Sequence, residues 1–365
     1  MIKFLDINRQ DKNLLKSNVK DIIKVIKNND FINGNNVKVF ERNFSKFCNT
    51  KFSVGCNSGT DALFLALKSL NLKKNSEVLL PAQTYCSTLF SVINAGLKPV
   101  LVDIQADNPT ICINDLKKKI SNKTKVLIIV HLYGECCNIK EIRKLIKNKK
   151  IYLLEDAAQA HGALDYSYGK KGKIAGSIGH MACFSFYPGK NLGAYGDAGA
   201  ITTNNSKYFK KILKLRNLGG SKKYEHSIIG LNSRLDTIQA SILINKLKNL
   251  NTNNNKRKEI AKFYNNNIKN KFVKLIKYSK GCVYHQFVIL CYKEKKLINL
   301  FNKKKIQWGK HYPKPLHKLE ATKKIFVNQT FPNSEKFSMH GISLPIDPNL
   351  KKSELIKICN LINSL

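Results

Sequence analysis

The first 250 residues alternate between short apolar runs and stretches with apolar residues at helical spacing. The apolar runs predict five strands, at residues 52–56, 77–80, 99–103, 126–130 and 151–154. Between them, Leu63, Leu67 and Leu70 recur at helical spacing, as do Ile142 and Ile146. Helices are also expected over 15–26 and near Leu89. These repeated units predict an α/β fold, with a mostly parallel sheet covered by helices on both faces.

The pattern changes after residue 180. Strands at 182–186 and 198–203 are separated by a turn-rich loop and not by a helix, so we expect an antiparallel strand here. A helix over 235–247 is followed by the polar run 251–258, which is the best candidate for a domain boundary. We therefore predict a large domain over 1–250 and a smaller α+β domain over 251–365, with a strand at 283–290 and a final helix.

Composition and charge narrow the function classes. The chain has 365 residues, and 64 Lys and Arg against 24 Asp and Glu give a formal net charge of +40. Such a charge suits a nucleic-acid-binding protein, but the basic residues are spread along the chain and no binding module is recognisable. No apolar run reaches 18 residues, so we predict neither a membrane span nor a signal peptide.

The cysteines and histidines indicate neither disulfides nor a metal site. The ten cysteines include no C-x-x-C pair, and several lie inside apolar runs, as reduced core thiols do. We therefore expect a cytoplasmic protein. His161, His180 and the pair Cys136-Cys137 lack the spacing of zinc ligands or of a redox motif, so no metal is predicted.

One candidate motif presents a single lysine. Lys190 follows a strand and the turn Pro188-Gly189, which would place its amine at the edge of the sheet. Desolvation or a nearby cation can lower the pKa of a lysine from ~10.4 and make the amine nucleophilic towards a carbonyl. An ordinary surface lysine is the simpler interpretation of this motif alone.

Two further motifs contain groups that bind a phosphorylated heterocycle. Glu155 and Asp156 end a buried strand, where an aspartate could keep a pyridine nitrogen protonated. Ser58-Gly59-Thr60 opens a helix after a strand, and backbone N–H groups at a helix start form a phosphate site. A helix cap is an ordinary explanation of each motif by itself. Together with Lys190, they match the needs of pyridoxal 5′-phosphate (PLP).

Three longer segments resemble the DegT/DnrJ/EryC1/StrS family of sugar aminotransferases. They run from Glu155 to Ala163, from Ser185 to Gly193 and from Gly230 to Asp236, in this order. The resemblance covers nearly the whole chain, from Asp30 to Ile346. It implies the aspartate-aminotransferase fold, which is PLP fold type I, in a homodimer with shared active sites.

The resemblance also implies a role for each matching residue. Lys190 matches the lysine that binds the cofactor covalently and transfers protons, and Asp156 matches the partner of its pyridine nitrogen. The other cofactor contacts are matched by Gly59, Thr60 and Ser185 at the phosphate, Gln159 near the phenolic oxygen, Tyr85 stacked on the ring, and Asn232, which reaches the cofactor of the neighbouring subunit.

The implied reaction moves an amino group from L-glutamate to the 3-keto carbon of a dTDP-linked 6-deoxyhexose. In that subgroup, the residues that match Tyr187, Lys223, His311 and Tyr312 line the sugar-nucleotide pocket. Judged without the resemblance, a surface lysine or a hydrogen-bonded loop residue is about as good an explanation of each of these four. Gly220 departs from the polar residue that is usual in the loop around Lys223.

Three other functions stay open at this point. The first is a 4-aminotransferase of a UDP- or dTDP-4-keto sugar, and the second is a PLP-binding regulator without catalytic activity. The third is the basic nucleic-acid-binding protein that the net charge raises. A PLP-dependent sugar dehydratase would carry histidine in place of Lys190, so this lysine argues against it.

Overall fold

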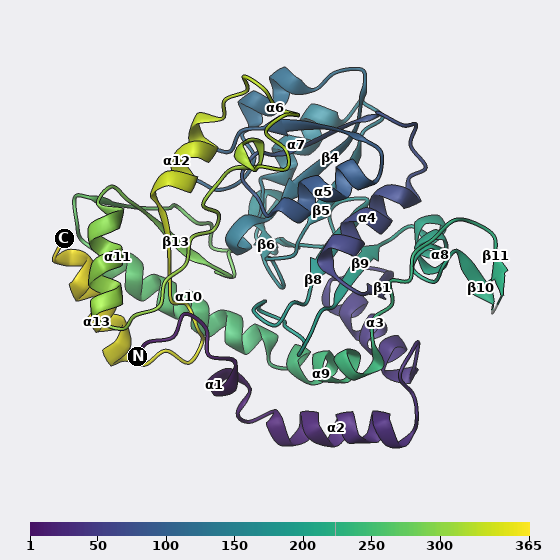
Figure 1. Ribbon diagram of the computed structural model, residues 1–365, viewed down its shortest axis with the longest axis horizontal. Coiled ribbons are helices and arrows are strands. Elements are labelled where there is room, and N and C mark those ends of the chain that lie inside the picture. Colours follow the sequence, from purple (N-terminus) through teal and green to yellow (C-terminus); the bar gives the residue numbers. More distant parts are fainter. Residues whose placement is uncertain (223) are drawn as a thin grey trace.

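The main sheet of the computed structural model, which describes residues 1–222 and 224–365, has seven strands (Figure 1). Their order is β1-β9-β8-β5-β4-β2-β3. The bounds are β1 (Phe52–Cys56), β2 (Glu77–Pro81), β3 (Lys98–Val102), β4 (Thr124–Val130), β5 (Tyr152–Asp156), β8 (Met181–Ser185) and β9 (Gly199–Thr203). In this sheet β9 pairs antiparallel with both of its neighbours, β1 and β8, and the other strand pairs are parallel. The structure confirms the predicted parallel strands and the antiparallel addition.

Helices cover both faces of this sheet because successive strand residues point to opposite sides. Met181 and Cys183 pack on the side of α4 (Gly59–Ser69), α5 (Cys86–Asn94) and α8 (Ser206–Leu215). Ala182 and Phe184 pack on the other side, against α3 (Asn35–Phe47) and α9 (Thr237–Leu247). Helices α6 (Ile113–Lys119) and α7 (Ile139–Ile146) cover the rest of that second face. The predicted three-layer α/β architecture is therefore confirmed.

A second, antiparallel sheet follows in the C-terminal part of the chain. It is formed by β12 (Val273–Leu275), β13 (Phe287–Cys291) and β14 (Gly341–Leu344). Its helices are α11 (Glu294–Lys303), α12 (Pro332–His340) and α13 (Lys352–Asn363), and the long α10 (Leu250–Asn267) extends between the two sheets (Figure 1). The strand predicted over 283–290 is partly wrong, because it begins only at Phe287 and residues 282–286 form a loop.

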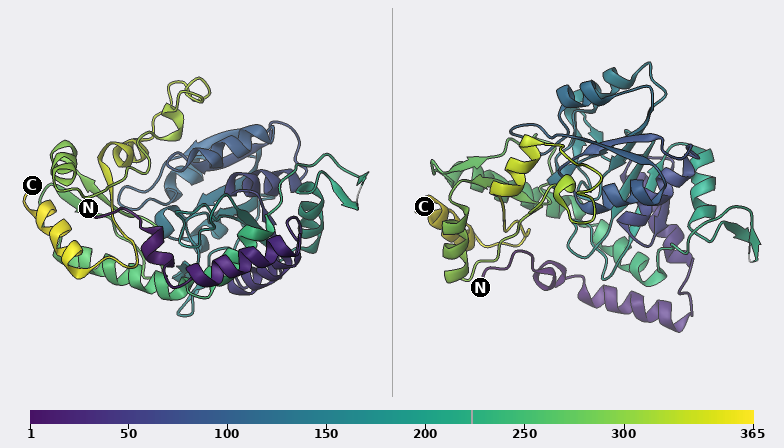
Figure 2. Two further views of the ribbon diagram at one scale, coloured as in Figure 1. Left: turned by 60° about the horizontal axis from the view of Figure 1, so that its bottom comes forward. Right: turned by 45° about the horizontal axis from the view of Figure 1, so that its top comes forward.

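The polar run 251–258 lies inside α10 and is not a linker. Asn254 and Arg257 of this helix are only 3% and 2% exposed. The buried side of α10 therefore contains polar as well as apolar residues. Residues before and after the predicted boundary also meet elsewhere, because Ile2 pairs with Ile306 in a parallel bridge. Figure 2 shows the two chain termini near this second sheet. The division into 1–250 and 251–365 stays a prediction.

The remaining elements are short or lie at the surface. The short helices are α1 (Ile7–Asp11), η1 (Leu132–Gly134), η2 (Tyr166–Tyr168) and η3 (Leu316–Lys318). Two small antiparallel pairs are formed by β6 (Leu164–Asp165) with β7 (Lys173–Ile174), and by β10 (Gly220–Lys222) with β11 (Glu225–His226). The β10-β11 hairpin stands out from the body of the molecule (Figure 2). No helix within the described ranges has the length and apolar character to cross a membrane.

The predicted N-terminal helix is confirmed as α2 (Leu15–Lys27), which packs along α9. Its amphipathic pattern does not correspond to burial within this chain. Asn18 and Val25 are its buried residues, whereas much of its apolar side is exposed. The exposed apolar residues are Leu15, Val19, Ile23 and Ile26.

A buried ion pair connects α1 to α9. Asp11 Oδ2 lies 2.7 Å from Lys246 Nζ, and each side chain is 6% exposed. The two charges compensate each other in an environment where an unpaired charge is strongly unfavourable.

We predict that Asp11→Asn lowers the free energy of unfolding by about 3 kcal/mol, because it leaves the Lys246 ammonium buried without its counter-charge. Urea unfolding of both proteins at neutral pH measures the difference. The matched control is Glu320→Gln, which removes one partner of the exposed pair Lys323–Glu320 and should cost less than about 1 kcal/mol. Equal effects of the two variants would contradict the prediction.

Candidate active site

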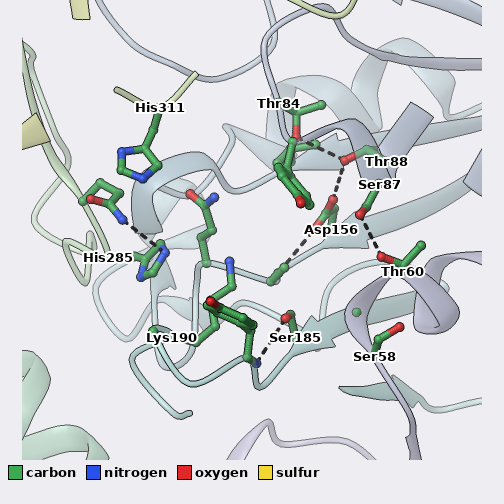
Figure 3. Close-up of a pocket in the computed structure, with 18 of the residues that line it drawn as sticks. Ser58, Thr60, Thr84, Ser87, Thr88, Asp156, Ser185, Lys190, His285 and His311 are labelled. Atoms are coloured by element: carbon green, nitrogen blue, oxygen red, sulfur yellow. Dashed lines mark hydrogen bonds between the residues drawn. The ribbon is translucent and has the colours of Figure 1, made fainter. Parts of the chain in front are cut away.

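A cavity of about 590 Å³ lies at the carboxyl ends of β5 and β8 (Figure 3). It brings together ten of the residues that the sequence predicted for the site, which are Gly59, Thr60, Tyr85, Asp156, Gln159, Ser185, Tyr187, Lys190, His311 and Tyr312. Asn232 is exposed and is not part of the lining. Lys223 falls outside the residues that the structure describes.

Hydroxyl groups gather where α4 begins. Ser58 caps this helix by accepting a hydrogen bond from the backbone N–H of Asp61 at 3.1 Å, and Thr60 Oγ1 lies 2.7 Å from Ser87 Oγ. A Cβ at Gly59 would lie 2.6 Å from Ser185 Cβ, so only glycine allows α4 to approach β8 this closely. The helix start, with its free N–H groups and hydroxyls, is suited to a phosphate.

The carboxylate of Asp156 faces the same cavity from the end of β5. Burial raises its pKa, while hydrogen bonds from Thr88 and from the backbone N–H of Ala158, with the charge of Lys190, act to lower it. The donor atoms lie 2.8 Å from Oδ2 and 3.2 Å from Oδ1, respectively. Thr88 was not among the predicted site residues.

Among the described residues that line this cavity, Lys190 is the only lysine. Desolvation lowers the pKa of its amine to about 8, although the negative charge of Asp156 acts in the opposite direction. A substantial fraction of the amine is therefore neutral at slightly alkaline pH, as a nucleophile requires. The sequence could not show this shift, because it arises from the surrounding walls.

Gln159 connects the loop after β5 to Tyr133 and to Tyr312 by hydrogen bonds. Its Oε1 accepts a hydrogen bond from the backbone N–H of Tyr133 at 2.7 Å, and its Nε2 donates to Tyr312 Oη at 2.8 Å. Tyr85 lies beside Tyr312, with ring centroids 5.5 Å apart. The hydroxyl of Tyr133 donates to the backbone carbonyl of His311, so the 311–312 segment is held against η1.

His285 is a lining residue that sequence reasoning missed. Asn191 Nδ2 donates to the backbone carbonyl of Val283 at 3.1 Å and to Asn254 Oδ1 at 2.9 Å, which leaves Asn191 Oδ1 as an acceptor. His285 Nδ1, at 3.2 Å from this oxygen, therefore carries the proton. Desolvation and the charge of Lys190 hold the pKa of His285 well below its usual value, so the ring is neutral and Nε2 is an acceptor.

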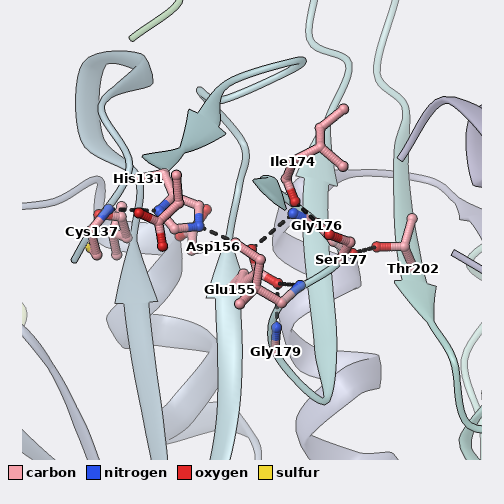
Figure 4. A network of polar contacts seen from close by, with 12 residues as sticks. His131, Cys137, Glu155, Asp156, Ile174, Gly176, Ser177, Gly179 and Thr202 are labelled. Carbon is pink, nitrogen blue, oxygen red and sulfur yellow. Dashed lines mark hydrogen bonds and ion pairs between the residues drawn. The ribbon is translucent and has the colours of Figure 1, made fainter. Parts of the chain in front are cut away.

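A buried network holds the end of β5 from the opposite face (Figure 4). Glu155, which is 0% exposed, accepts hydrogen bonds from the backbone N–H groups of Gly176, Ile178 and Gly179 at 2.8, 2.8 and 2.5 Å. His131 Nε2 lies 3.1 Å from the same carboxylate. The backbone N–H of Cys137 donates to His131 Nδ1, so Nε2 is the ring nitrogen that donates to Glu155.

Comparison with known proteins identifies the class to which this fold and site belong. The model of the DegT/DnrJ/EryC1/StrS aminotransferase family matches residues 12–363. The chain therefore belongs to this family. It is a PLP-dependent aminotransferase, and the predicted fold class is confirmed.

Particular relatives extend over almost the whole chain. It is 37% identical over 365 residues to the dTDP-3-amino-3,6-dideoxy-alpha-D-galactopyranose transaminase of Aneurinibacillus thermoaerophilus, covering 100% of this chain and 99% of that protein. DesV of Streptomyces venezuelae, solved in complex with a ketimine intermediate, superimposes with a TM-score of 0.95 at 32% identity over 100% of this chain and 98% of its own. Ntda of Bacillus subtilis, solved with bound PMP, has a TM-score of 0.87 at 27% identity, covering 95% and 81%.

The residues in the cavity fit PLP. Lys190 would supply a nucleophilic amine for its aldehyde and Asp156 a carboxylate for its ring nitrogen, while Thr60 and Ser185, beside the glycine-permitted contact between α4 and β8, would hold its phosphate. When bound, the cofactor supplies an electron sink for charge that develops on the substrate carbon. Among residues 1–222 and 224–365, no cluster of three or more acidic, histidine or cysteine side chains is arranged to hold a metal.

We predict that Lys190 in the cofactor-free protein reacts with acetic anhydride with a midpoint near pH 8, because burial lowers the pKa of its amine. Labelling at a series of pH values, followed by mass spectrometry of the Lys190 peptide, measures the midpoint. In Asp156→Asn the midpoint should fall further, since the charge of Asp156 raises the pKa of Lys190. A midpoint near the ordinary lysine value of ~10.4 would contradict the prediction.

Proposed function

We propose that this chain transfers the amino group of L-glutamate to the 3-keto carbon of a dTDP-linked 6-deoxyhexose. The observation that carries the proposal is one cavity in which a desolvated amine, Lys190, lies with a buried carboxylate, Asp156, and a phosphate site. The 3-amino-3,6-dideoxy sugar in the name of the 37% identical relative supports the substrate class.

In this proposal, Lys190 and Asp156 have different tasks. Lys190 Nζ would bond the aldehyde carbon of the cofactor and, once displaced by the substrate amine and neutral, would take the proton from the substrate carbon that bears nitrogen and return it to that cofactor carbon. Asp156 holds the proton on the ring nitrogen. Donor and acceptor would occupy the same cavity in turn, which gives ping-pong kinetics.

The mouth of the cavity offers groups for the sugar nucleotide. We assign sugar contacts to Tyr187, His311 and Tyr312, which line it beside Lys190. Burial and the charge of Lys190 lower the pKa of His311 to about 4, so its ring is neutral at physiological pH. Lys223, which the structure does not describe, stays a predicted contact to the pyrophosphate.

The proposed protein is a cytoplasmic homodimer that completes each site with Asn232 of the other copy. Asn232 is exposed and lies outside the cavity of its own chain, as expected for a residue that acts across an interface. The exposed apolar side of α2 offers surface that a second copy could bury. In each copy, domains 1–250 and 251–365 would enclose the cavity between them.

The reaction predicts two separable half-reactions. Adding L-glutamate to the holoenzyme should bleach the visible absorption of the cofactor, and adding the dTDP-linked 3-keto sugar should restore it. NMR of the product should place the new amine on C3; an amine on C4 would identify a 4-aminotransferase instead. No bleaching with glutamate would contradict both the donor and the reaction class.

The proposed role of Lys190 is tested by substitution. Lys190→Ala should abolish the absorption of the covalently bound cofactor and lower turnover at least about a hundredfold, because the amine is both anchor and proton carrier. Absorption spectra and turnover measure the two effects. Lys170→Ala, which removes an exposed lysine, is the control and should behave as wild type. A yellow and active Lys190→Ala protein would refute the assignment.

The proposed sugar contacts predict that losing one of them weakens binding of the sugar nucleotide and not of L-glutamate. Tyr187 is 59% exposed, so Tyr187→Ala should fold normally. It should raise KM for the sugar nucleotide about tenfold, as for one lost hydrogen bond or packing contact, and leave the glutamate half-reaction unchanged. Steady-state kinetics with each substrate varied separately distinguishes this outcome from a general loss of activity.

A further inference from the structure

Two threonines form a hydrogen-bonded chain to Asp156. Thr88 Oγ1, on α5, donates to Asp156 Oδ2 at 2.8 Å, and Thr84 Oγ1 lies 3.1 Å from Thr88 Oγ1 (Figure 3). Thr84 is 3% exposed and Thr88 is 0% exposed. Both line the cavity, yet neither belongs to the residues that the family resemblance assigned to the cofactor.

The charge of Asp156 determines the direction of this chain. An ionised carboxylate only accepts, so Thr88 donates to it and is itself free to accept from Thr84. With a protonated carboxyl, Oδ2 can still accept from Thr88, but the negative charge no longer strengthens this hydrogen bond. The chain Thr84–Thr88–Asp156 therefore stabilises the ionised carboxylate more than the protonated carboxyl.

We propose that Thr88, supported by Thr84, is a positioning residue that keeps Asp156 ionised and oriented for the ring nitrogen of PLP. This inference rests on the proposed role of Asp156. Asp156 Oδ1 accepts from the backbone N–H of Ala158 at 3.2 Å, so each oxygen already has one protein donor. One lone pair on each oxygen stays available for the cofactor.

The other groups around Asp156 do not replace this hydrogen bond. The titratable neighbours are Lys190, His131, Cys183 and Tyr312. Burial raises the pKa of the Cys183 thiol and of the Tyr312 hydroxyl well above their usual values, so both are neutral, and the Nε2 of His131 faces Glu155 at 3.1 Å and not Asp156. The charge of Lys190 also lowers the pKa of Asp156, but in the proposed function this amine is committed to the aldehyde when PLP is bound.

Binding of pyridoxamine 5′-phosphate tests the proposal, because this ligand has the pyridine nitrogen but no aldehyde for Lys190. Titration calorimetry of the cofactor-free full chain measures its affinity between pH 5 and 9. Thr88→Val should weaken binding about tenfold or more at neutral pH, as expected for a lost hydrogen bond to a charged group. Thr88→Ser, which keeps the hydroxyl, should stay near wild type.

The pH profile separates positioning from a merely structural role. The Thr88 hydrogen bond lowers the pKa of Asp156. Its removal raises that pKa, so Asp156 stays protonated up to a higher pH. The acid limb of the affinity profile should therefore move to higher pH in Thr88→Val and not in Thr88→Ser. Thr84→Val should move the limb in the same direction by less, and the double variant should be no worse than Thr88→Val.

Two further variants complete the test. Thr203→Val removes another buried hydroxyl, which donates to His180 O at 2.8 Å at the far end of β9, and should lower stability without changing the affinity profile. Asp156→Asn should abolish the acid limb. If it binds like wild type, the proposed role of Asp156 fails; if it weakens binding but Thr88→Val does not, only the present inference is overturned. Should Thr88→Val not fold, the shift in Thr84→Val decides, and an unshifted limb there overturns the inference.

Discussion

The buried carboxylate of Glu155 is the interaction on which the arrangement of the site depends. An ionised carboxylate in the interior costs several kcal/mol unless donors replace its water. Here the donors come from the chain on both sides of β5, since three backbone N–H groups belong to the segment that leads into β8 and the fourth donor is His131 after β4. The hydrogen bonds to this one carboxylate therefore fix the end of β4, the end of β5 and the segment before β8 relative to each other. Asp156 is the next residue after Glu155, so its position is fixed as well. The backbone N–H of His131 even donates to the carbonyl of Asp156 at 3.0 Å.

The alternation of a β-strand gives these two adjacent carboxylates opposite surroundings. Glu155 points to the face where its hydrogen bonds, led by those from His131 and the amides, overcome the effect of burial and lower its pKa. Asp156 points into the cavity, where burial prevails and raises its pKa. One carboxylate is thus saturated with donors and structural, while its neighbour keeps lone pairs for a ligand. Lys190, in the loop after β8, completes the balance, because burial destabilises its charged amine and Asp156 stabilises it.

The sequence predicted those parts of the site that follow strands directly. Gly59, Asp156 and Lys190 each come shortly after an apolar run, and parallel strands bring such positions to one edge of the sheet. Thr88 and His285 could not be found in this way. Thr88 lies inside the helix α5 and has no pattern that distinguishes it from a buried helix residue. His285 lies in a loop whose buried Cys282 and Val283 imitate the start of a strand, so local apolarity concealed its place at the cavity. Asn232 depends on an interface that one chain does not contain.

The net charge acquires a physical meaning once burial is known. In the described ranges, eight acidic side chains are buried, against three basic ones, which are Arg216, Lys246 and Arg257. Since the whole chain has 24 acidic and 64 basic residues, the surface is more positive than the composition alone indicates. A positive surface raises the rate at which anionic ligands arrive, but at physiological salt the field decays over about 8 Å and does not distinguish one anion from another. Selection among anions must therefore occur inside the cavity, through the contacts that Lys190, Asp156 and the hydroxyls at α4 offer to a ligand.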